Sequence, residues 1–323
     1  MSTPSGQRLL TVAAAQLGPI TSLDSPRSDA LTRMINLCSE AAEKNVRLLV
    51  FPELAFTTFF PGYIIEKQED IDKFFEPASP KDPSAIIHSP NGKSLFDKAT
   101  ELGIDIYIGY GERWTAEDEK VTYYNTAIYY SATQKRAIAK YRKVHLPGRY
   151  EPDTRPGVTQ QLEKRFFTVG DLGFEAFRVP DLIPGAVKSK DAISTESTQG
   201  QGDPIMGMLL CNDRRWAEGW RSYGLQGVEI VLVSRLRQTE FYPGKAGKED
   251  HGSLIAGSSI VDPNGHIIAE SKTEGDELVC ATIDLAMCRK GKDRVFDFAK
   301  HRRPERYHRL LSQVGVEEPA LLD

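Results

Sequence analysis

Short apolar runs alternate with an amphipathic segment in the first part of the chain. Leu9–Gln16 is an apolar run of strand length, and residues 46–51 (VRLLVF) form a second one. Between them, apolar side chains recur at helical spacing from Leu31 to Ala42. A strand, a helix and a strand in this order favour an α/β fold in which helices cover a parallel sheet.

The same patterns predict the remaining elements. Further strands are expected at residues 104–111, 121–131, 136–141, 206–210, 227–233, 254–261, 267–271 and 278–284. Helices are expected at residues 66–75, 94–102 and 216–224 and at the end of the C-terminal segment 296–311. Residues 262–265 (DPNG) are typical of a hairpin turn. Because strands of one pattern continue throughout, we predict a single domain spanning residues 1–323.

One stretch, residues 183–204, differs in kind from its surroundings. It is rich in serine, threonine and glycine and contains few large apolar residues. Such a composition cannot bury enough apolar surface to order a core. We therefore predict a flexible surface insertion within the domain.

Composition and charge exclude several classes of protein. The 323 residues include 41 Lys and Arg against 45 Asp and Glu, a net charge of −4, which gives no reason to expect nucleic acid or an anionic membrane as a partner. No apolar run approaches the roughly 20 residues of a membrane helix. The polar start, Met1–Arg8, lacks the apolar core of a secretory signal. We therefore expect a cytoplasmic protein.

The four cysteines show no paired spacing with another Cys or His, which indicates reduced thiols rather than disulfides or a zinc site. Cys211 differs from Cys38, Cys280 and Cys288 because it ends the short apolar strand 206–210, just before a helix. A thiol there can be exposed at the turn, and the positive end of the helix would favour the thiolate and give it the lowest pKa of the four. The alternative is a buried cysteine that packs as a small apolar residue.

Two more strand ends carry ionisable side chains. Glu53 follows the run 46–51, at the edge where α/β sheets bind ligands. The aromatic loop 54–63 after it would limit its hydration and help it to act as a base near neutral pH. Lys143 follows the strand 136–141 and would lie at the same edge. Each side chain can instead be an exposed, solvated charge, which is the more common case.

The three strand ends and their flanks closely resemble the nitrilase superfamily of carbon–nitrogen hydrolases. The matching stretches are FPEL around Glu53, YRKVHLP around Lys143 and LCNDRRW around Cys211, in this order and spacing. Within the superfamily, the chain most resembles the N-carbamoyl-D-amino acid amidohydrolases. The evidence is TTFFP after Glu53, LEKRFF at 162–167, GDLGF at 170–174 and HRRP at 301–304.

This resemblance implies the fold and the partners. The fold would be α/β, a four-layer α-β-β-α sandwich with two sheets packed face to face and helices outside. The protein would form a homo-oligomer, a dimer or a tetramer, in part through its C-terminal segment. Its other partner would be a small-molecule N-carbamoyl amino acid or amide, and no metal or organic cofactor would be needed.

The resemblance also implies the chemistry. Cys211 would be the nucleophile that attacks a carbonyl carbon. Glu53 would take the thiol proton, return it to the leaving amine and later activate water. Lys143 would hold positive charge where the oxyanion forms, with the backbone N–H of Asn212 as a second donor. Glu163, the counterpart of a second family glutamate, would position the substrate or relay a proton.

Three further residues are assigned to the substrate or to support of the site. Arg214 and Arg215 offer forked donors suited to the carboxylate of an N-carbamoyl amino acid, although adjacent arginines can also form a solvated surface pair. His145 would support the site by hydrogen bonding or have a purely structural role. The predicted reaction is hydrolysis of an N-carbamoyl (D-)amino acid to the free amino acid, ammonia and carbon dioxide.

The chain departs from the family pattern after Val233. Relatives have there a substrate loop with an Asn-Thr pair, a helix and a further central strand, whereas residues 234–243 lead almost directly to Gly244. We therefore predict a deletion that removes one wall of the pocket, with weak or no carbamoylase activity and reduced stability. Two alternatives stay open: another amidase of the superfamily, such as a β-ureidopropionase or an aliphatic amidase, and a catalytically impaired, non-enzymatic member.

Overall fold

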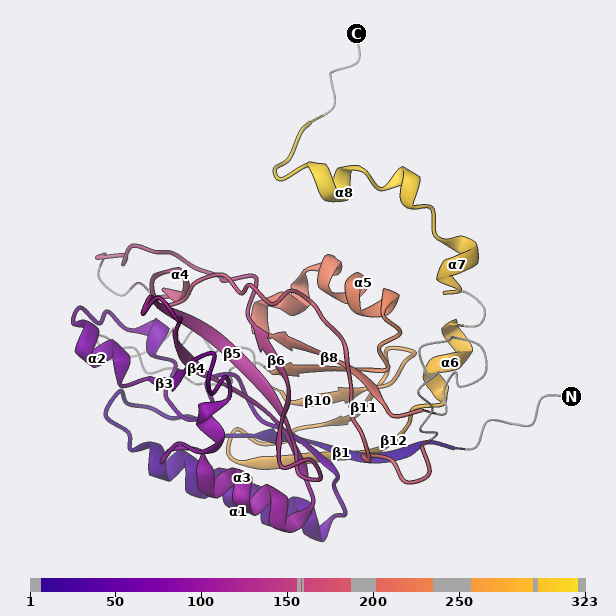
Figure 1. Cartoon of the computed structure of the whole chain (residues 1–323), viewed down its shortest axis with the longest axis horizontal. Coiled ribbons are helices and arrows are strands. Elements are labelled where there is room, and N and C mark those ends of the chain that lie inside the picture. Colours follow the sequence, from indigo (N-terminus) through magenta and orange to yellow (C-terminus); the bar gives the residue numbers. More distant parts are fainter. Residues whose placement is uncertain are drawn as a thin grey trace, which may run out of the picture.

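Two stacked layers of β-strands lie at the centre of the protein, with helices on their outer faces (Figure 1). The computed structural model describes residues 7–155, 158, 160–186, 202–234, 257–292 and 296–318. Most of the predicted insertion at 183–204, and the segment 235–256 that follows the predicted deletion, lie outside the described residues. Both therefore stay predictions.

The larger layer is a mixed sheet of seven strands. They are β1 (Leu9–Gln16), β2 (Leu48–Val50), β3 (Phe75–Ala78), β4 (Asp105–Thr115), β5 (Val121–Ser131), β6 (Arg136–Arg142) and β12 (Glu277–Asp284). β1, β2 and β4 run parallel, as the strand–helix–strand order predicts. The pairs β12–β1, β4–β5 and β5–β6 are antiparallel, so the expected parallel sheet is mixed. The β4–β5 and β5–β6 connections are hairpins, too short for the crossover that parallel strands need.

Successive side chains of this sheet enter two separate cores, as a period of two requires. Ile106 and Ile108 pack in the core beneath α1 (Arg27–Glu43) and α3 (Lys93–Leu102). Tyr107, between them in sequence, packs in the core between the two layers of strands. The middle of the strand is therefore apolar on both faces, as expected for a strand that is covered on both sides.

The second layer contains two separate sheets in the described part of the chain. One consists of β7 (Phe177–Arg178), β8 (Ile205–Leu210) and β9 (Ile230–Ser234), and the other is the predicted hairpin of β10 (Ser259–Val261) and β11 (Ile267–Glu270). The helix α5 (Ala217–Leu225) joins β8 to β9 and covers the outer face of their sheet. Its Tyr223 ring occupies the space beside Gly207, where a Cβ atom would lie 2.7 Å from the ring. The layers are therefore helix, sheet, sheet and helix, which is the four-layer sandwich that was expected.

The short elements show where local patterns were insufficient. They are the helices α2 (Gln68–Asp72), α4 (Glu163–Phe166), α6 (Met287–Lys292), α7 (Phe298–His301) and α8 (Arg309–Ser312), and the 3-10 turns η1 (Phe60–Gly62), η2 (Ala85–Ile87), η3 (Cys211–Arg215) and η4 (Pro304–Arg306). The helix predicted at 66–75 spans five residues, because Phe75 instead begins β3, which pairs with β4. Pairing at the sheet edge overrides a local helical pattern there.

The C-terminal segment leaves the sandwich. It ends in a helix, α8, as predicted, and α7 and η4 precede it; α8 lies apart from the sheets (Figure 1). Large apolar side chains of this segment are exposed, namely Phe296, Leu310, Leu311, Val314 and Val316. None of the described helices is long and apolar enough to cross a membrane.

Candidate active site

Glu53 lies beyond the carboxyl end of β2, where the chain turns sharply into the aromatic loop. Gly109 of β4 backs this turn, since a Cβ atom there would lie 2.7 Å from the Cα atom of Glu53. Leu54 adopts a left-handed φ of 49°, a strained conformation for leucine. The Ala55 N–H donates to the Gly109 carbonyl at 2.9 Å. A tight backbone fit to a neighbouring strand therefore holds Glu53, which is completely buried.

Lys143 directly follows β6, and its ammonium group lies between two carboxylates. Its Nζ atom donates to Glu53 Oε1 at 2.7 Å and to Glu163 Oε2 at 2.6 Å. All three side chains are at most 1% exposed, which excludes the alternative of solvated charges. Burial disfavours the charged form of Lys143, but the carboxylates of Glu163 and Glu53 outweigh it and raise its pKa. The ammonium therefore stays positive at neutral pH.

Asn125 of β5 connects the members of this cluster. Its side-chain Nδ2 atom donates to Glu53 Oε1 at 2.7 Å. Its backbone carbonyl accepts from the backbone N–H of Lys143 at 2.8 Å. Burial raises the pKa of Glu163 to about 7, while Lys143 and a hydrogen bond from Asn125 oppose the rise. Sequence reasoning missed Asn125. The available signal was a single amide inside a strand of mostly aromatic and β-branched residues.

Cys211 ends β8, at the predicted turn between a strand and a helix. It has a left-handed φ of 45° and begins the turn η3. The Arg214 Nη1 atom donates to the Cys211 carbonyl at 2.6 Å and lies 3.8 Å from Sγ. The thiol interacts electrostatically with Glu53, Lys143 and Glu163. The fold thus brings together the three strand ends that were identified in the sequence.

The prediction that Cys211 has the lowest pKa of the four cysteines is wrong. Burial, followed by the Glu53 carboxylate, raises the pKa of the thiol to about 12, against the opposing effect of Lys143. The pKa of Cys38 is also about 12, so Cys211 does not have a distinctly low value. The helix α5 begins only at Ala217, too far along the chain for its dipole to favour the thiolate. The resting thiol is therefore neutral and needs a neighbouring base to become a nucleophile.

His145 and Asn212 link the loop after β6 to the turn after β8. Asn212 Nδ2 donates to the His145 carbonyl at 3.1 Å. The His145 ring stacks on Trp216 with centroids 4.5 Å apart, and its Nδ1 atom lies 2.8 Å from Asp213 Oδ1. Asp213 is completely buried. Sequence reasoning used it only as part of a motif; the signal was an acid three residues beyond a buried strand.

The two arginines predicted to bind the substrate have different environments. Arg214 is partly buried and contacts the residue that carries the thiol. Arg215 is exposed, and its Nη1 atom donates to Asn212 Oδ1 at 3.2 Å. Of the pair, Arg214 therefore has the position expected for a substrate contact, and Arg215 has the character of a surface arginine.

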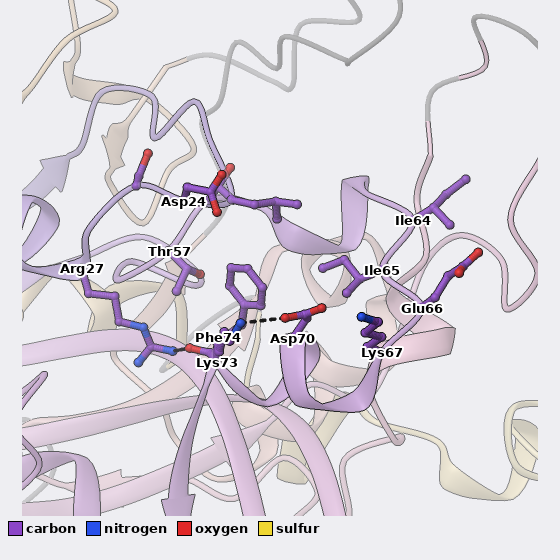
Figure 2. Close-up of a pocket in the computed structure, with 13 residues that line it drawn as sticks. Asp24, Arg27, Thr57, Ile64, Ile65, Glu66, Lys67, Asp70, Lys73 and Phe74 are labelled. Atoms are coloured by element: carbon purple, nitrogen blue, oxygen red, sulfur yellow. Dashed lines mark hydrogen bonds and ion pairs between the residues drawn. The ribbon is translucent and has the colours of Figure 1, made fainter.

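Two cavities differ in their relation to this cluster. One of about 330 Å³ adjoins it and is lined by Val144, His145, Leu146, Lys164, Phe167, Val169, Asn212 and Trp216. A larger one, of about 630 Å³, lies between the loop before α1 and residues 57–74 (Figure 2). None of the predicted site residues lines the larger cavity, so size is a poor guide here to the chemistry. Among the residues with described positions, no group of three or more His, Cys, Asp or Glu side chains could hold a metal ion.

The layered fold defines a nitrilase-type hydrolase, and comparison with known proteins gives the family. The sequence model of the family "Carbon-nitrogen hydrolase" matches residues 11–251, and the chain belongs to this family. It is 27% identical over 291 residues to a nitrilase of Pyrococcus abyssi, covering 84% of this chain and 90% of the relative. It is 24% identical over 335 residues to the N-carbamoylputrescine amidase of Arabidopsis thaliana, covering 92% and 96%.

A solved structure agrees with the fold. The carbon-nitrogen hydrolase of Helicobacter pylori superimposes with a TM-score of 0.66 at 18% identity, covering 95% of this chain and 99% of that one. The likeness is one of fold, because the identity is low. Together with the family match, it confirms the predicted nitrilase superfamily, the four-layer fold and a hydrolase that acts on C–N bonds.

Proposed function

We propose that the chain hydrolyses the carbamoyl amide of N-carbamoyl amino acids, with Cys211 as nucleophile, Glu53 as base and Lys143 as oxyanion partner. The observation that carries this proposal is the burial of the Lys143 ammonium between Glu53 and Glu163, beside the Cys211 thiol. Fixed positive charge in a water-poor site strongly stabilises negative charge that develops on a carbonyl oxygen.

The proposed reaction has two stages. Glu53 removes the thiol proton of Cys211, and the sulfur forms a bond to the carbamoyl carbon. Lys143 and the backbone N–H of Asn212 stabilise the oxyanion. The C–N bond then breaks, and the departing amine takes the proton from Glu53. Water that Glu53 deprotonates attacks the carbon and displaces the sulfur, which takes the proton back from Glu53. The carbamic acid that is released breaks down to carbon dioxide and the second amine, so the products of both stages are the free amino acid, ammonia and carbon dioxide.

The remaining predicted residues have supporting roles in this proposal. Glu163 holds the Lys143 ammonium in place, and His145 supports the site through Asp213. Arg214 and Arg215 bind the substrate carboxylate with forked donors. The name of the Arabidopsis relative, N-carbamoylputrescine amidase, supports a carbamoyl group as the reacting part. The preference for a D-amino acid rests on the resemblance carried by the motifs after Glu53 and at 162–167, 170–174 and 301–304.

Ammonia release by the purified full-length chain tests this proposal. The panel comprises N-carbamoyl-D- and N-carbamoyl-L-amino acids, β-ureidopropionate and simple aliphatic amides. We expect turnover of N-carbamoyl-D-amino acids that exceeds turnover of the other classes. Activity confined to β-ureidopropionate or to simple amides would instead identify one of the other amidases of the superfamily.

A catalytically impaired member of the family is the second candidate. The support is in the sequence, where residues 234–243 lead almost directly to Gly244 at the place where relatives have a loop, a helix and a central strand. The test is a chimaera that restores a relative's loop, helix and strand between Val233 and Gly244. We expect at least a tenfold gain in turnover and a higher Tm. Equal turnover and Tm in the chain and the chimaera would contradict the deletion.

We also propose a single cytoplasmic domain that assembles into a dimer or tetramer. The exposed apolar side chains of the C-terminal segment support assembly, because such residues rarely remain in contact with water in a monomer. The four cysteines, all outside disulfides, support a reducing compartment. Light scattering during gel filtration measures the oligomeric state, and a chain ending at residue 295 that kept the same state would argue against assembly through this segment.

A further inference from the structure

One buried carboxylate, that of Asp213, joins the two parts of the fold that carry Lys143 and Cys211. Its Oδ2 atom accepts from the Tyr141 hydroxyl at 2.7 Å and from the Leu210 N–H at 3.3 Å. Its Oδ1 atom lies 2.8 Å from both the N–H and the Nδ1 atom of His145. Asp213 is completely buried, so water does not complete its shell. Four protein groups surround it instead.

The groups that contact Asp213 lie close to Lys143 and Cys211 in the sequence. Tyr141 and His145 lie two residues before and two residues after Lys143, on and just beyond β6 of the large sheet. Leu210 immediately precedes Cys211 at the end of β8, which belongs to the second layer. The Asp213 carboxylate therefore contacts a residue on each side of Lys143, the proposed oxyanion partner. It also contacts the residue that precedes Cys211, the proposed nucleophile.

The chemistry of the shell requires an ionised carboxylate at this position. An ionised aspartate only accepts hydrogen bonds, and all four surrounding groups can donate. Burial and the nearby Asp213 charge raise the pKa of Tyr141, so its hydroxyl keeps its proton and remains a donor. An asparagine of the same shape would place an NH2 group against two donors. Asp213→Asn thus disturbs the shell with little change in volume.

We propose that Asp213 is a positioning residue that sets the separation between the Lys143 ammonium and the Cys211 thiol across the two sheets. It does not touch the substrate; it acts through Tyr141, His145 and Leu210. The inference rests on the proposed roles of Lys143 and Cys211. Misplacement of reacting groups by about 1 Å can lower a rate about 100-fold.

Asp105 provides a matched control. It is also a buried aspartate that accepts from a tyrosine hydroxyl, that of Tyr129 at 2.9 Å, and from a backbone N–H, that of Ala132 at 2.8 Å. It lies at the start of β4, whereas the proposed catalytic residues lie beyond the ends of β2, β6 and β8. Asp105→Asn should therefore lower stability without moving Lys143 relative to Cys211.

The experiment compares Asp213→Asn and Asp105→Asn in the full chain by Tm, by kcat and KM, and by the alkylation rate of Cys211 with iodoacetamide, measured by peptide mass spectrometry. We expect Asp213→Asn to lower kcat at least 100-fold with KM within threefold. We also expect Cys211 to be alkylated at least fivefold faster, since its loosened turn admits solvent, while Cys280 is unchanged. Asp105→Asn should stay within threefold of the parent in kcat and in alkylation.

Two outcomes would overturn the proposal. One is an Asp213→Asn protein whose kcat and Cys211 alkylation match those of the parent. The other is Asp105→Asn and Asp213→Asn proteins that are impaired equally. If Asp213→Asn does not fold, Tyr141→Phe removes one donor and keeps the carboxylate; we expect about a tenfold loss in kcat and threefold faster alkylation, and no change would overturn the inference. If the parent hydrolyses no substrate, the proposed function fails, whereas alkylation still tests Asp213.

Discussion

Two buried ion clusters meet at the end of β6, and they differ in how completely their polar atoms are matched. Lys143 lies between the carboxylates of Glu53 and Glu163. The preceding residue, Arg142, belongs instead to a cluster around Glu112, whose side chain is also completely buried. These two neighbouring residues thus enter different networks. In one, a single cation lies between two acids; in the other, Glu112 lies between two cations, Lys140 and Arg142, and Arg142 also pairs with Asp171.

The Glu112 cluster is saturated. Glu112 accepts from Lys140, from Thr126 Oγ1 at 2.9 Å and from Arg142 Nε at 2.7 Å. The Arg142 guanidinium also lies 3.9 Å from the centroid of the Tyr124 ring. In a network of this kind each charge is offset by an opposite charge or by several donors, and the network holds strands together.

The Glu53 cluster is not saturated. Glu53 Oε2 and Asn125 Oδ1 are buried, and neither has a hydrogen-bond partner among the described residues. Such unmatched atoms are rare in folded proteins, and in a proposed active site they leave acceptors free for a substrate. The contrast indicates that saturation, rather than burial or charge, separates the cluster proposed for catalysis from the structural one.

The largest effect is expected for the nucleophile. Cys211→Ala should abolish turnover of every substrate that the parent hydrolyses, because no covalent intermediate can form. The protein should stay folded, since alanine fits the space of cysteine. Ammonia release and a thermal melt measure the two properties. An alanine variant with wild-type turnover would remove Cys211 from the proposed mechanism.

The next effect tests the comparison itself. Glu53→Gln should lower kcat at least 1,000-fold with a small loss of stability, because Lys143 keeps Glu163 as a partner. Glu112→Gln should instead lower the stability strongly and change kcat little. It should cost about 3–5 kcal/mol of unfolding free energy, since it removes the buried negative charge that Lys140 and Arg142 share, while the folded fraction keeps kcat within about threefold. Urea unfolding and steady-state kinetics measure both variants. A similar profile for the two would mean that saturation does not distinguish the clusters.

A smaller effect is expected at the substrate end. Arg214→Ala should weaken binding of a carboxylate-bearing substrate by about 2–5 kcal/mol, if the carboxylate is buried against the guanidinium. The exposed Arg215 should matter less, because water screens its charge. Hydrolysis of an uncharged amide by either variant serves as the control. Equal losses on charged and uncharged substrates would assign Arg214 a structural role.

The smallest effect is a pH dependence of stability. Burial raises the pKa of Glu163 to about 7 from a reference value of 4.5, so the folded state binds its proton more tightly than the unfolded state. The associated stabilisation is present below about pH 4.5 and is lost as the pH rises through about 7. Glu163→Gln should flatten this slope between pH 5 and pH 8. Unfolding curves at these two values suffice, and equal slopes in parent and variant would contradict the shift.

Much of the fold follows from local pattern. The runs that became β1, β5 and β6 and the helix α3 were predicted almost to the residue, because each has a strong period of two or of 3.6. The helix α3 ends at Leu102, as predicted, and the left-handed Gly103, with φ of 67°, caps it. β3 was missed because its pairing with β4 is a contact between distant segments, which no local period records.

For the site, the sequence by itself determined the candidates, through motifs around Glu53, Lys143 and Cys211 that mark a family. Only the tertiary structure decided their protonation states. The pKa of Cys211 is raised, contrary to expectation, because packing of both sheets removes water and brings Glu53 to the thiol. Asn125 and Asp213 carried only weak local signals. Asn125 meets Glu53 and Lys143 through strands of the large sheet, and the contacts of Asp213 form where the two layers meet. Charge states depend on burial and on neighbours in space, which a linear chain specifies only by folding.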